Sequence, residues 1–249
     1  MIHIEKIWKK FGDKQVHRGI SFDVQDKETT VVLGRSGGGK SVLLKMIIGL
    51  VKPDSGSIEV DGKDVSKMSY KELRALRFKF GFLFQGAALF DSMSVGENIA
   101  LSLRRHTGWT EGEITASIKY ALHVVGLDNV EDVMPSSLSG GMKKRVGLAR
   151  AIALTPRYVL YDEPTTGLDM ETADGINMLI KEMRTKLGIT SIVVTHDIHS
   201  AFVVGDRFVV LDQGTTLMSG TRDEIQNSAN EEVRKYINSS LPMAEGHGA

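Results

Sequence analysis

Short runs of apolar, mostly β-branched residues recur along the chain, separated by longer stretches in which apolar positions have helical spacing. Three of these runs, at residues 29–33, 159–161 and 191–195, predict strands covered on both faces, as in parallel sheets. Each run leads directly into polar or glycine-containing residues. These residues are therefore expected at the carboxyl ends of the strands, the edge where open α/β sheets bind ligands.

The two ends of the chain have alternating apolar and polar positions, which predict antiparallel strands flanking the core. The N-terminal pattern consists of Ile2, Ile4 and Ile7, followed by Ile20, Phe22 and Val24. Towards the other end, residues 208–211 and 215–218 flank the turn signal Asp212-Gln213-Gly214. A polar helix is expected over residues 221–238, and the tail at 241–249 is expected to be disordered.

Helical segments fill the interval between the first two buried strands. Capping-box patterns begin several of them: Ser69 to Glu72, Ser94 to Glu97 and Thr110 to Glu113. The stretch from about residue 94 to 154 is mostly helical in pattern, and we interpret it as an insertion into the α/β core. A chain of 249 residues is long enough for one large core, so residues 1–240 are expected to form a single domain.

Composition and charge exclude several classes of function. Lys plus Arg and Asp plus Glu both total 31, so no overall basic charge favours nucleic acid as a partner. The absence of cysteine excludes disulfides and Cys-ligated metals. The N-terminus lacks the apolar run of a signal peptide, and the apolar stretch 42–51 is shorter than the roughly 20 residues that span a bilayer. We expect a cytoplasmic protein, peripheral on a membrane if another chain supplies the spans.

A phosphate-binding loop follows the first buried strand. Gly34-Arg35-Ser36-Gly37-Gly38-Gly39-Lys40-Ser41 matches GxxxxGK[ST], and a helical run that begins at Val42 follows it. Glycine amides and the helix N-terminus suit phosphate oxygens, Lys40 suits the β- and γ-phosphates, and the Ser41 hydroxyl suits Mg²⁺. A simple glycine-rich turn would need neither Lys40 nor Ser41. The loop therefore predicts a bound nucleotide, ATP, together with Mg²⁺.

Two adjacent carboxylates, Asp162 and Glu163, end the second buried strand. Because successive strand side chains point in opposite directions, the two can take different roles. Asp162 can hold Mg²⁺ through water, and Glu163 can orient the attacking water. Phosphoryl transfer still requires that water to be oriented after the metal ion and lysine have neutralised the phosphate charge. An acidic strand end facing solvent is the alternative for the pair taken alone.

Leu138-Ser139-Gly140-Gly141-Met142 resembles the LSGGQ signature of the ABC ATPase family, and it lies just upstream of the strand that ends in Asp162. The resemblance implies a RecA-like P-loop core with flanking antiparallel strands and a helical signature subdomain. Ser139, Gly140 and Gly141 would form a second anion-binding helix N-terminus. A chain that already binds its nucleotide at the first loop has no evident use for it, whereas the family uses it in a head-to-tail dimer.

Other positions resemble the family's remaining motifs, and the resemblance covers nearly the whole chain. It implies a Q-loop at Phe84-Gln85, with Gln85 near Mg²⁺ and the attacking water, a D-loop at 166–169, an H-switch with His196 at the γ-phosphate, and an adenine-stacking A-loop at Phe11-Gly12. A phenylalanine near a strand end can instead belong to the core. The basic cluster Lys143-Lys144-Arg145 is interpreted as a solvated helix face, with phosphate or lipid headgroup binding as the alternative.

Two departures from the commonest family pattern resemble its lipid-transport branch, the Mla-type or MCE-associated systems. These are Met142 in place of glutamine and the segment after Gln85, residues 86–100. The resemblance implies a membrane permease that contacts residues near 86–105, and an MCE-type lipid-binding subunit in the same system. Within that segment Ala87, Ala88, Leu89, Phe90 and Met93 are expected to offer an apolar surface.

Two other functions remain open from the sequence. One is a soluble ABC ATPase, for example in iron–sulfur assembly, and the other is an ABC importer or exporter of a different substrate. A P-loop kinase outside the family is disfavoured, because it would need neither the signature nor His196.

Overall fold

The structure is a computed structural model that describes residues 1–238, so the tail predicted at 241–249 lies outside the described residues. Its larger sheet has the strand order β10-β9-β3-β8-β7-β6. Neighbouring strands are parallel except β10, which pairs antiparallel with β9. The strands are β3 (Thr29–Gly34), β6 (Phe80–Leu83), β7 (Tyr158–Asp162), β8 (Thr190–Thr195), β9 (Arg207–Asp212) and β10 (Thr215–Thr221). The three predicted buried strands are confirmed as the central neighbours β3, β8 and β7.

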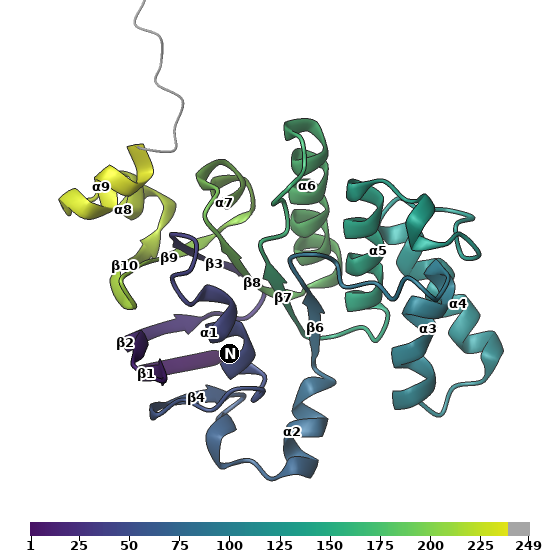
Figure 1. Ribbon diagram of the computed structural model, residues 1–249, viewed down its shortest axis with the longest axis horizontal. Coiled ribbons are helices and arrows are strands. Elements are labelled where there is room, and N and C mark those ends of the chain that lie inside the picture. Colours follow the sequence, from purple (N-terminus) through teal and green to yellow (C-terminus); the bar gives the residue numbers. More distant parts are fainter. Residues whose placement is uncertain (239–249) are drawn as a thin grey trace, which may run out of the picture.

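The second sheet is antiparallel, with the order β2-β1-β4-β5. It contains β1 (Ile2–Phe11), β2 (Lys14–Val24), β4 (Ser55–Val60) and β5 (Lys63–Asp64). The predicted flanking strands are thus confirmed, and sequence patterning missed β4, β5 and β6. The helix α1 (Lys40–Ile47) packs its apolar side chains into one buried cluster with residues of both sheets, including Ile4, Val32 and Leu160. The second sheet therefore covers α1 on the side away from the larger sheet (Figure 1).

A second apolar cluster lies on the opposite face of the larger sheet. It joins α6 (Met170–Leu187) and α7 (Ile198–Val204) to a helical group of α3 (Val95–His106), α4 (Glu111–Val124) and α5 (Gly140–Ile152). The helical group lies beyond β6, at one end of the molecule (Figure 1). The predicted capping boxes are present at α3, α4 and α2 (Tyr70–Arg77). Short 3-10 turns lie at Val65–Lys67 and Pro135–Ser137.

The single C-terminal helix predicted for residues 221–238 is wrong. The structure has two helices there, α8 (Arg222–Gln226) and α9 (Glu231–Asn238). Asn227 donates from its side chain to the carbonyl of Asp223 at 3.0 Å, and the side-chain oxygen of Asn230 accepts from the amide of Glu232 at 2.9 Å. Asparagine side chains compete in this way with the backbone hydrogen bonds of a helix, so the two helices end and begin around them.

The register of the larger sheet brings three polar strand ends to one edge. Leu33 pairs with Thr195, and Asp162 pairs with Val194. The residues that follow each strand therefore emerge side by side, although those after β3 lie more than a hundred residues from the other two sets in the sequence. This edge is where the phosphate loop, the two carboxylates and His196 meet.

Replacing Gly81 should test how closely the helical group packs against the sheet. Gly81 lies in β6, and a Cβ atom there would overlap the backbone carbonyl of Ala151 in α5. Because a backbone carbonyl cannot move aside cheaply, we expect Gly81→Ala to lower the free energy of unfolding by about 1–3 kcal/mol, measured by denaturant titration. Gly108→Ala is the control, since a Cβ there meets no atom of the described residues within 4 Å, and it should change stability by less than about 0.5 kcal/mol. Equal stability of the two variants would show that β6 and α5 adapt freely.

Candidate functional site

The loop between β3 and α1 folds around the side chain of Lys40. Gly37 and Gly39 have φ angles of 76° and 86°, a left-handed conformation that glycine adopts without strain. The Lys40 ammonium donates to the carbonyls of Gly34 at 2.8 Å and Arg35 at 3.1 Å. Lys40 as a whole is only 5% exposed to solvent. Within residues 1–238, no side chain caps the N-terminus of α1. The amide groups of its first turn are therefore available to an anion.

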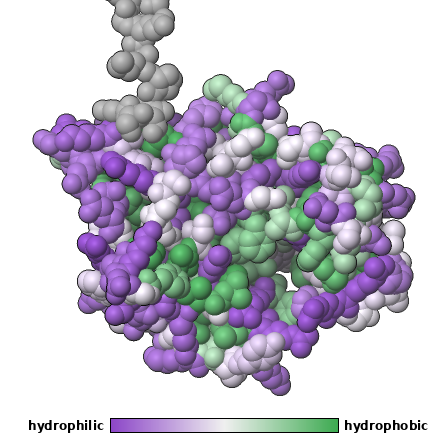
Figure 2. Space-filling view, in the orientation of Figure 1, coloured by the Kyte–Doolittle hydropathy of each residue, from purple (hydrophilic) through white to green (hydrophobic). Residues whose placement is uncertain are grey.

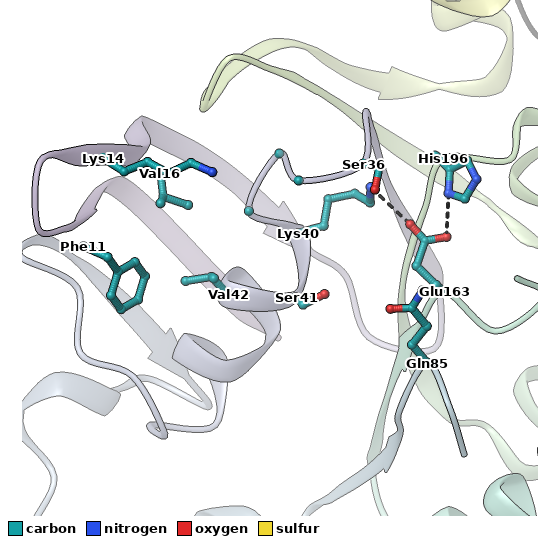
Figure 3. Close-up of a pocket in the computed structure, with 13 residues that line it drawn as sticks. Phe11, Lys14, Val16, Ser36, Lys40, Ser41, Val42, Gln85, Glu163 and His196 are labelled. Atoms are coloured by element: carbon teal, nitrogen blue, oxygen red, sulfur yellow. Dashed lines mark hydrogen bonds and ion pairs between the residues drawn. The ribbon is translucent and has the colours of Figure 1, made fainter. Parts of the chain in front are cut away.

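Glu163 lies at the centre of the charged groups. One carboxylate oxygen is 3.2 Å from the Lys40 ammonium, and the other is 2.9 Å from Nδ1 of His196 (Figure 3). The hydroxyl of Thr166 donates to that second oxygen at 3.1 Å. Burial by itself raises the pKa of Glu163, but the hydrogen bond from His196 and the Lys40 charge outweigh it and lower the pKa below its ordinary value. The carboxyl group is therefore held as a carboxylate.

Asp162 is in a different environment from its neighbour. Its carboxylate accepts a hydrogen bond from the Ser41 hydroxyl at 2.7 Å, which ties the end of β7 to the start of α1. Burial raises the pKa of Asp162, and the nearby Glu163 charge adds to the shift, whereas the Ser41 hydrogen bond opposes it. A cation placed beside Asp162 would reverse this shift by favouring the charged form.

The residues predicted to hold Mg²⁺ fit that ion. Ser41 and Asp162 present oxygen atoms to each other, and Gln85 lines the same cleft as Ser41. No group of three or more His, Cys, Asp or Glu side chains within residues 1–238 could form a protein-only metal cage. Mg²⁺ commonly uses one or two carboxylates and completes its shell with waters and substrate phosphates. Ser41 and Asp162 could hold the ion in this way, and bound Mg²⁺ would neutralise phosphate charge.

The cleft around these groups has a volume of about 380 Å³, within the range of small-molecule sites. Phe11, Val16 and Val42 line one end, away from Glu163 and His196 (Figure 3). Phe11 is 48% exposed and the Lys9 ammonium lies 5.2 Å from its ring centre, so Phe11 is not a core residue. The apolar end suits a base and the charged end suits phosphates. The full lining is Phe11, Lys14, Val16, Ser36, Gly37, Gly38, Gly39, Lys40, Ser41, Val42, Gln85, Glu163 and His196.

Most predicted residues line this cleft, but Gly34, Arg35, Asp162 and the signature residues do not. Ser139 is the N-cap of α5, and its hydroxyl accepts from the Met142 amide at 3.2 Å. Ser139, Gly140 and Gly141 are absent from the lining of the cleft. Sequence reasoning missed Lys14 and Val16, which reach the cleft because β2 pairs with β1. Only an alternating strand pattern around Ile20 pointed to that segment, and it gave no sign of ligand contact.

The basic cluster after the signature is not a solvated face. Lys144 is 5% exposed, and its ammonium donates to the backbone carbonyls of Gln85 and Glu163. Arg145 donates to the carbonyl of Val125 at 2.7 Å. Burial lowers the pKa of Lys144, and the carboxylates of Asp162 and Glu163 oppose that shift. The prediction is therefore wrong for Lys144, because α5 packs with this side chain directed at the ends of β6 and β7.

Comparison with known proteins identifies the family. The family model described as ABC transporter matches residues 17–166. The chain belongs to this family. Its fold is that of an ABC ATPase cassette: a dimeric ATP-binding cassette solved in a post-hydrolysis state with ADP and phosphate matches with a TM-score of 0.81. That match has 30% identity and covers 89% of this chain and 98% of the other. The chain is thus an ABC ATPase.

Curated relatives of this ABC ATPase carry different transport names. The probable ribonucleotide transport ATP-binding protein mkl of Mycobacterium leprae is 40% identical over 95% of this chain and 68% of its own length. The intermembrane phospholipid transport system ATP-binding protein MlaF of Haemophilus influenzae is 36% identical over 95% of this chain and 90% of its own. The methionine import ATP-binding protein MetN 1 of Bacillus cereus is 38% identical over 97% of this chain and 71% of its own length. The chain spans about two thirds of the mycobacterial relative.

Replacing Lys40 should abolish most nucleotide binding. Lys40→Ala removes the only ammonium bonded to the loop carbonyls of Gly34 and Arg35 within the described residues, and leaves phosphate charge uncompensated. We expect ATP affinity to fall at least about 30-fold, measured by equilibrium binding of a labelled nucleotide. The exposed Lys71→Ala is the control for loss of one positive charge. Unchanged ATP affinity in Lys40→Ala would show that this loop is not part of the nucleotide site.

Replacing Glu163 should separate binding from hydrolysis. Glu163→Gln keeps the shape of the side chain and an oxygen for His196, but it cannot polarise water as a carboxylate does. We expect kcat to fall about 100-fold or more while ATP still binds, so that a dimer with trapped nucleotide accumulates in size-exclusion chromatography. Glu232→Gln, at an exposed position in α9, should leave turnover unchanged. Near-normal turnover in Glu163→Gln would assign the activation of water to another group.

Proposed function

We propose that this ABC ATPase is the energy-supplying subunit of a membrane transporter for phospholipid, working with separate permease and lipid-binding subunits. The observation that carries the proposal is the match to a phospholipid transport ATPase along 90% of that protein, together with Met142 in the signature. Roles for individual residues are part of the proposal. Glu163 orients the attacking water, His196 and Lys40 hold the γ-phosphate, and Gln85 lies beside Mg²⁺ and the water.

Two copies of the chain would complete each hydrolysis site. The signature helix N-terminus at Ser139 lies outside the cleft of its own chain, so its anion-binding amides are available to a nucleotide on a second copy. A head-to-tail pair would place two such sites about a two-fold axis. The cassette dimer with ADP and phosphate supports this assembly by its similarity to the present fold.

The permease contact is proposed for the segment after Gln85, within residues 86–105. Phe90 is 51% exposed, and Leu101 of α3 is also exposed. The surface is smaller than the sequence suggested, because Ala87 is buried and Leu89 packs against the main core. The face shown in Figure 2 is hollowed between β6 and the helical group, with apolar side chains around the hollow. None of the described helices is long and apolar enough to cross a membrane.

The cargo is the part of the proposal that differs among relatives, since their names include ribonucleotide, phospholipid and methionine transport. The complex containing this chain should be isolated from its native membrane, and its subunits and bound small molecules identified by mass spectrometry. Phospholipid together with a lipid-binding subunit would support the proposal. A bound amino acid or nucleotide would contradict the lipid assignment but not the ATPase, and a complex with no membrane protein would favour a soluble ABC ATPase.

Replacing Phe90 should disrupt assembly with the permease while sparing the nucleotide site. An aspartate at this exposed position would place a charge in an apolar contact, whereas Leu89→Asp would also damage the core. We expect Phe90→Asp to lose co-purification with the permease and to keep ATP affinity within about twofold. Tyr120→Asp on α4 is a matched control, because Tyr120 is likewise 51% exposed. An intact complex purified with Phe90→Asp would move the permease contact elsewhere.

A further inference from the structure

Lys144 is a buried cation bonded to the backbone of Gln85 and Glu163, the two residues proposed above to lie at the attacking water. It lies in α5, one and a half turns after the signature N-cap Ser139, and is 5% exposed. A buried ammonium is costly unless its hydrogen atoms are bonded. Lys144 places two of its three N–H donors on backbone carbonyls, those of Gln85 and Glu163.

The two carbonyls belong to segments that are far apart in the sequence. Gln85 follows β6, and Glu163 follows β7, its parallel neighbour in the sheet. The ammonium is 3.2 Å from the Glu163 carbonyl and donates to the Gln85 carbonyl as well. One side chain therefore fixes the spacing between the main chains of the two residues. The side chains of Gln85 and Glu163 both line the cleft (Figure 3).

Both segments have backbone conformations that need support. Glu163 has a φ angle of 49°, and Ala87 and Ala88 have φ angles of 59° and 49°. Such left-handed conformations cost about 1–2 kcal/mol each in residues other than glycine, and they persist where surrounding contacts hold them. Lys144 bonds the carbonyl of Glu163 itself. Arg150, six residues further along α5, bonds the carbonyls of Ala87 and Ala88 at 2.5 and 2.7 Å.

We propose that Lys144 is a positioning residue for ATP hydrolysis, holding the main chains of Glu163 and Gln85 so that both side chains converge on the attacking water. Lys144 touches neither nucleotide nor water in this role, and acts through the two residues it bonds. The inference rests on the roles proposed for Glu163 and Gln85, and it is independent of the transported cargo. It assigns a function to the one member of the basic cluster that α5 buries.

The alternative is that Lys144 only fills space between α5 and the sheet. In that case its replacement by an apolar side chain of similar length would change stability and leave the catalytic step intact. A positioning role predicts a different result, because a displacement of about 1 Å in a catalytic group can cost about 100-fold in rate. The two roles therefore differ in kcat and not in melting temperature.

The test compares Lys144→Met, Lys144→Gln and Lys144→Arg with the wild-type chain. For each protein, kcat is measured at saturating Mg-ATP, affinity is measured with a non-hydrolysable ATP analogue, and folding is followed by the melting temperature. We expect Lys144→Met to lower kcat at least about tenfold, with analogue affinity kept within about threefold. Lys144→Arg, which keeps the charge and the donors, should recover most of kcat, and Lys144→Gln should fall between. Lys119→Met, an exposed lysine on α4, should match the wild type.

Two results would overturn the inference. One is a kcat for Lys144→Met within about twofold of wild type, and the other is a loss of kcat matched by an equal loss of analogue affinity. If Lys144→Met does not fold, the test rests on Lys144→Gln and Lys144→Arg. A kcat equal to that of the wild type in both variants would reject the positioning role. Glu163→Gln is measured alongside. Full activity in that variant would refute the role of Glu163, whereas its inactivity beside an active Lys144→Met would refute only the role of Lys144.

Discussion

The contact between Lys40 and Glu163 is the interaction on which the rest of the site depends. It joins the phosphate loop to the end of β7 across 3.2 Å, and the same carboxylate bonds His196 after β8. These groups come from three neighbouring strand ends, so the parallel sheet has to form before the contact can exist. An anion that enters the loop meets the cation that holds Glu163. Nucleotide binding and the position of Glu163 are therefore linked electrostatically.

The two halves of the molecule support this contact in different ways. On one side α1 is enclosed between the two sheets, which fixes the start of the helix and the Ser41–Asp162 hydrogen bond. On the other side α5 packs closely against β6, where only glycine fits at position 81. This close approach brings Lys144 within reach of the backbone after β6 and β7. The signature helix is thus bonded to the end of β7, which the phosphate loop also contacts through Lys40 and Ser41.

Much of the fold and the site could be predicted because the relevant residues are contiguous. The three central strands each occupy a few successive residues, and local patterns predicted them correctly. The phosphate loop and the Asp162-Glu163 pair are equally local in the sequence, and the structure brings them together at one edge of the sheet. The break between α8 and α9 was missed, because two asparagines outweighed a helical pattern. Lys14 and Val16 were missed because their place in the cleft follows from strand pairing.

By itself the sequence determined the class of chemistry, ATP hydrolysis, because binding the phosphates of a nucleotide requires particular residue types at fixed local spacing. It also determined which strands are central, because strands covered on both faces must be apolar throughout. Only the tertiary structure decided which charges are buried and what they bond. Lys143, Lys144 and Arg145 are three successive cations that the sequence pattern does not distinguish. The rotation of α5 against the sheet directs Lys144 at the carbonyls of Gln85 and Glu163. That rotation is set by packing between residues that are far apart in the sequence, and local sequence patterns carry no information about it.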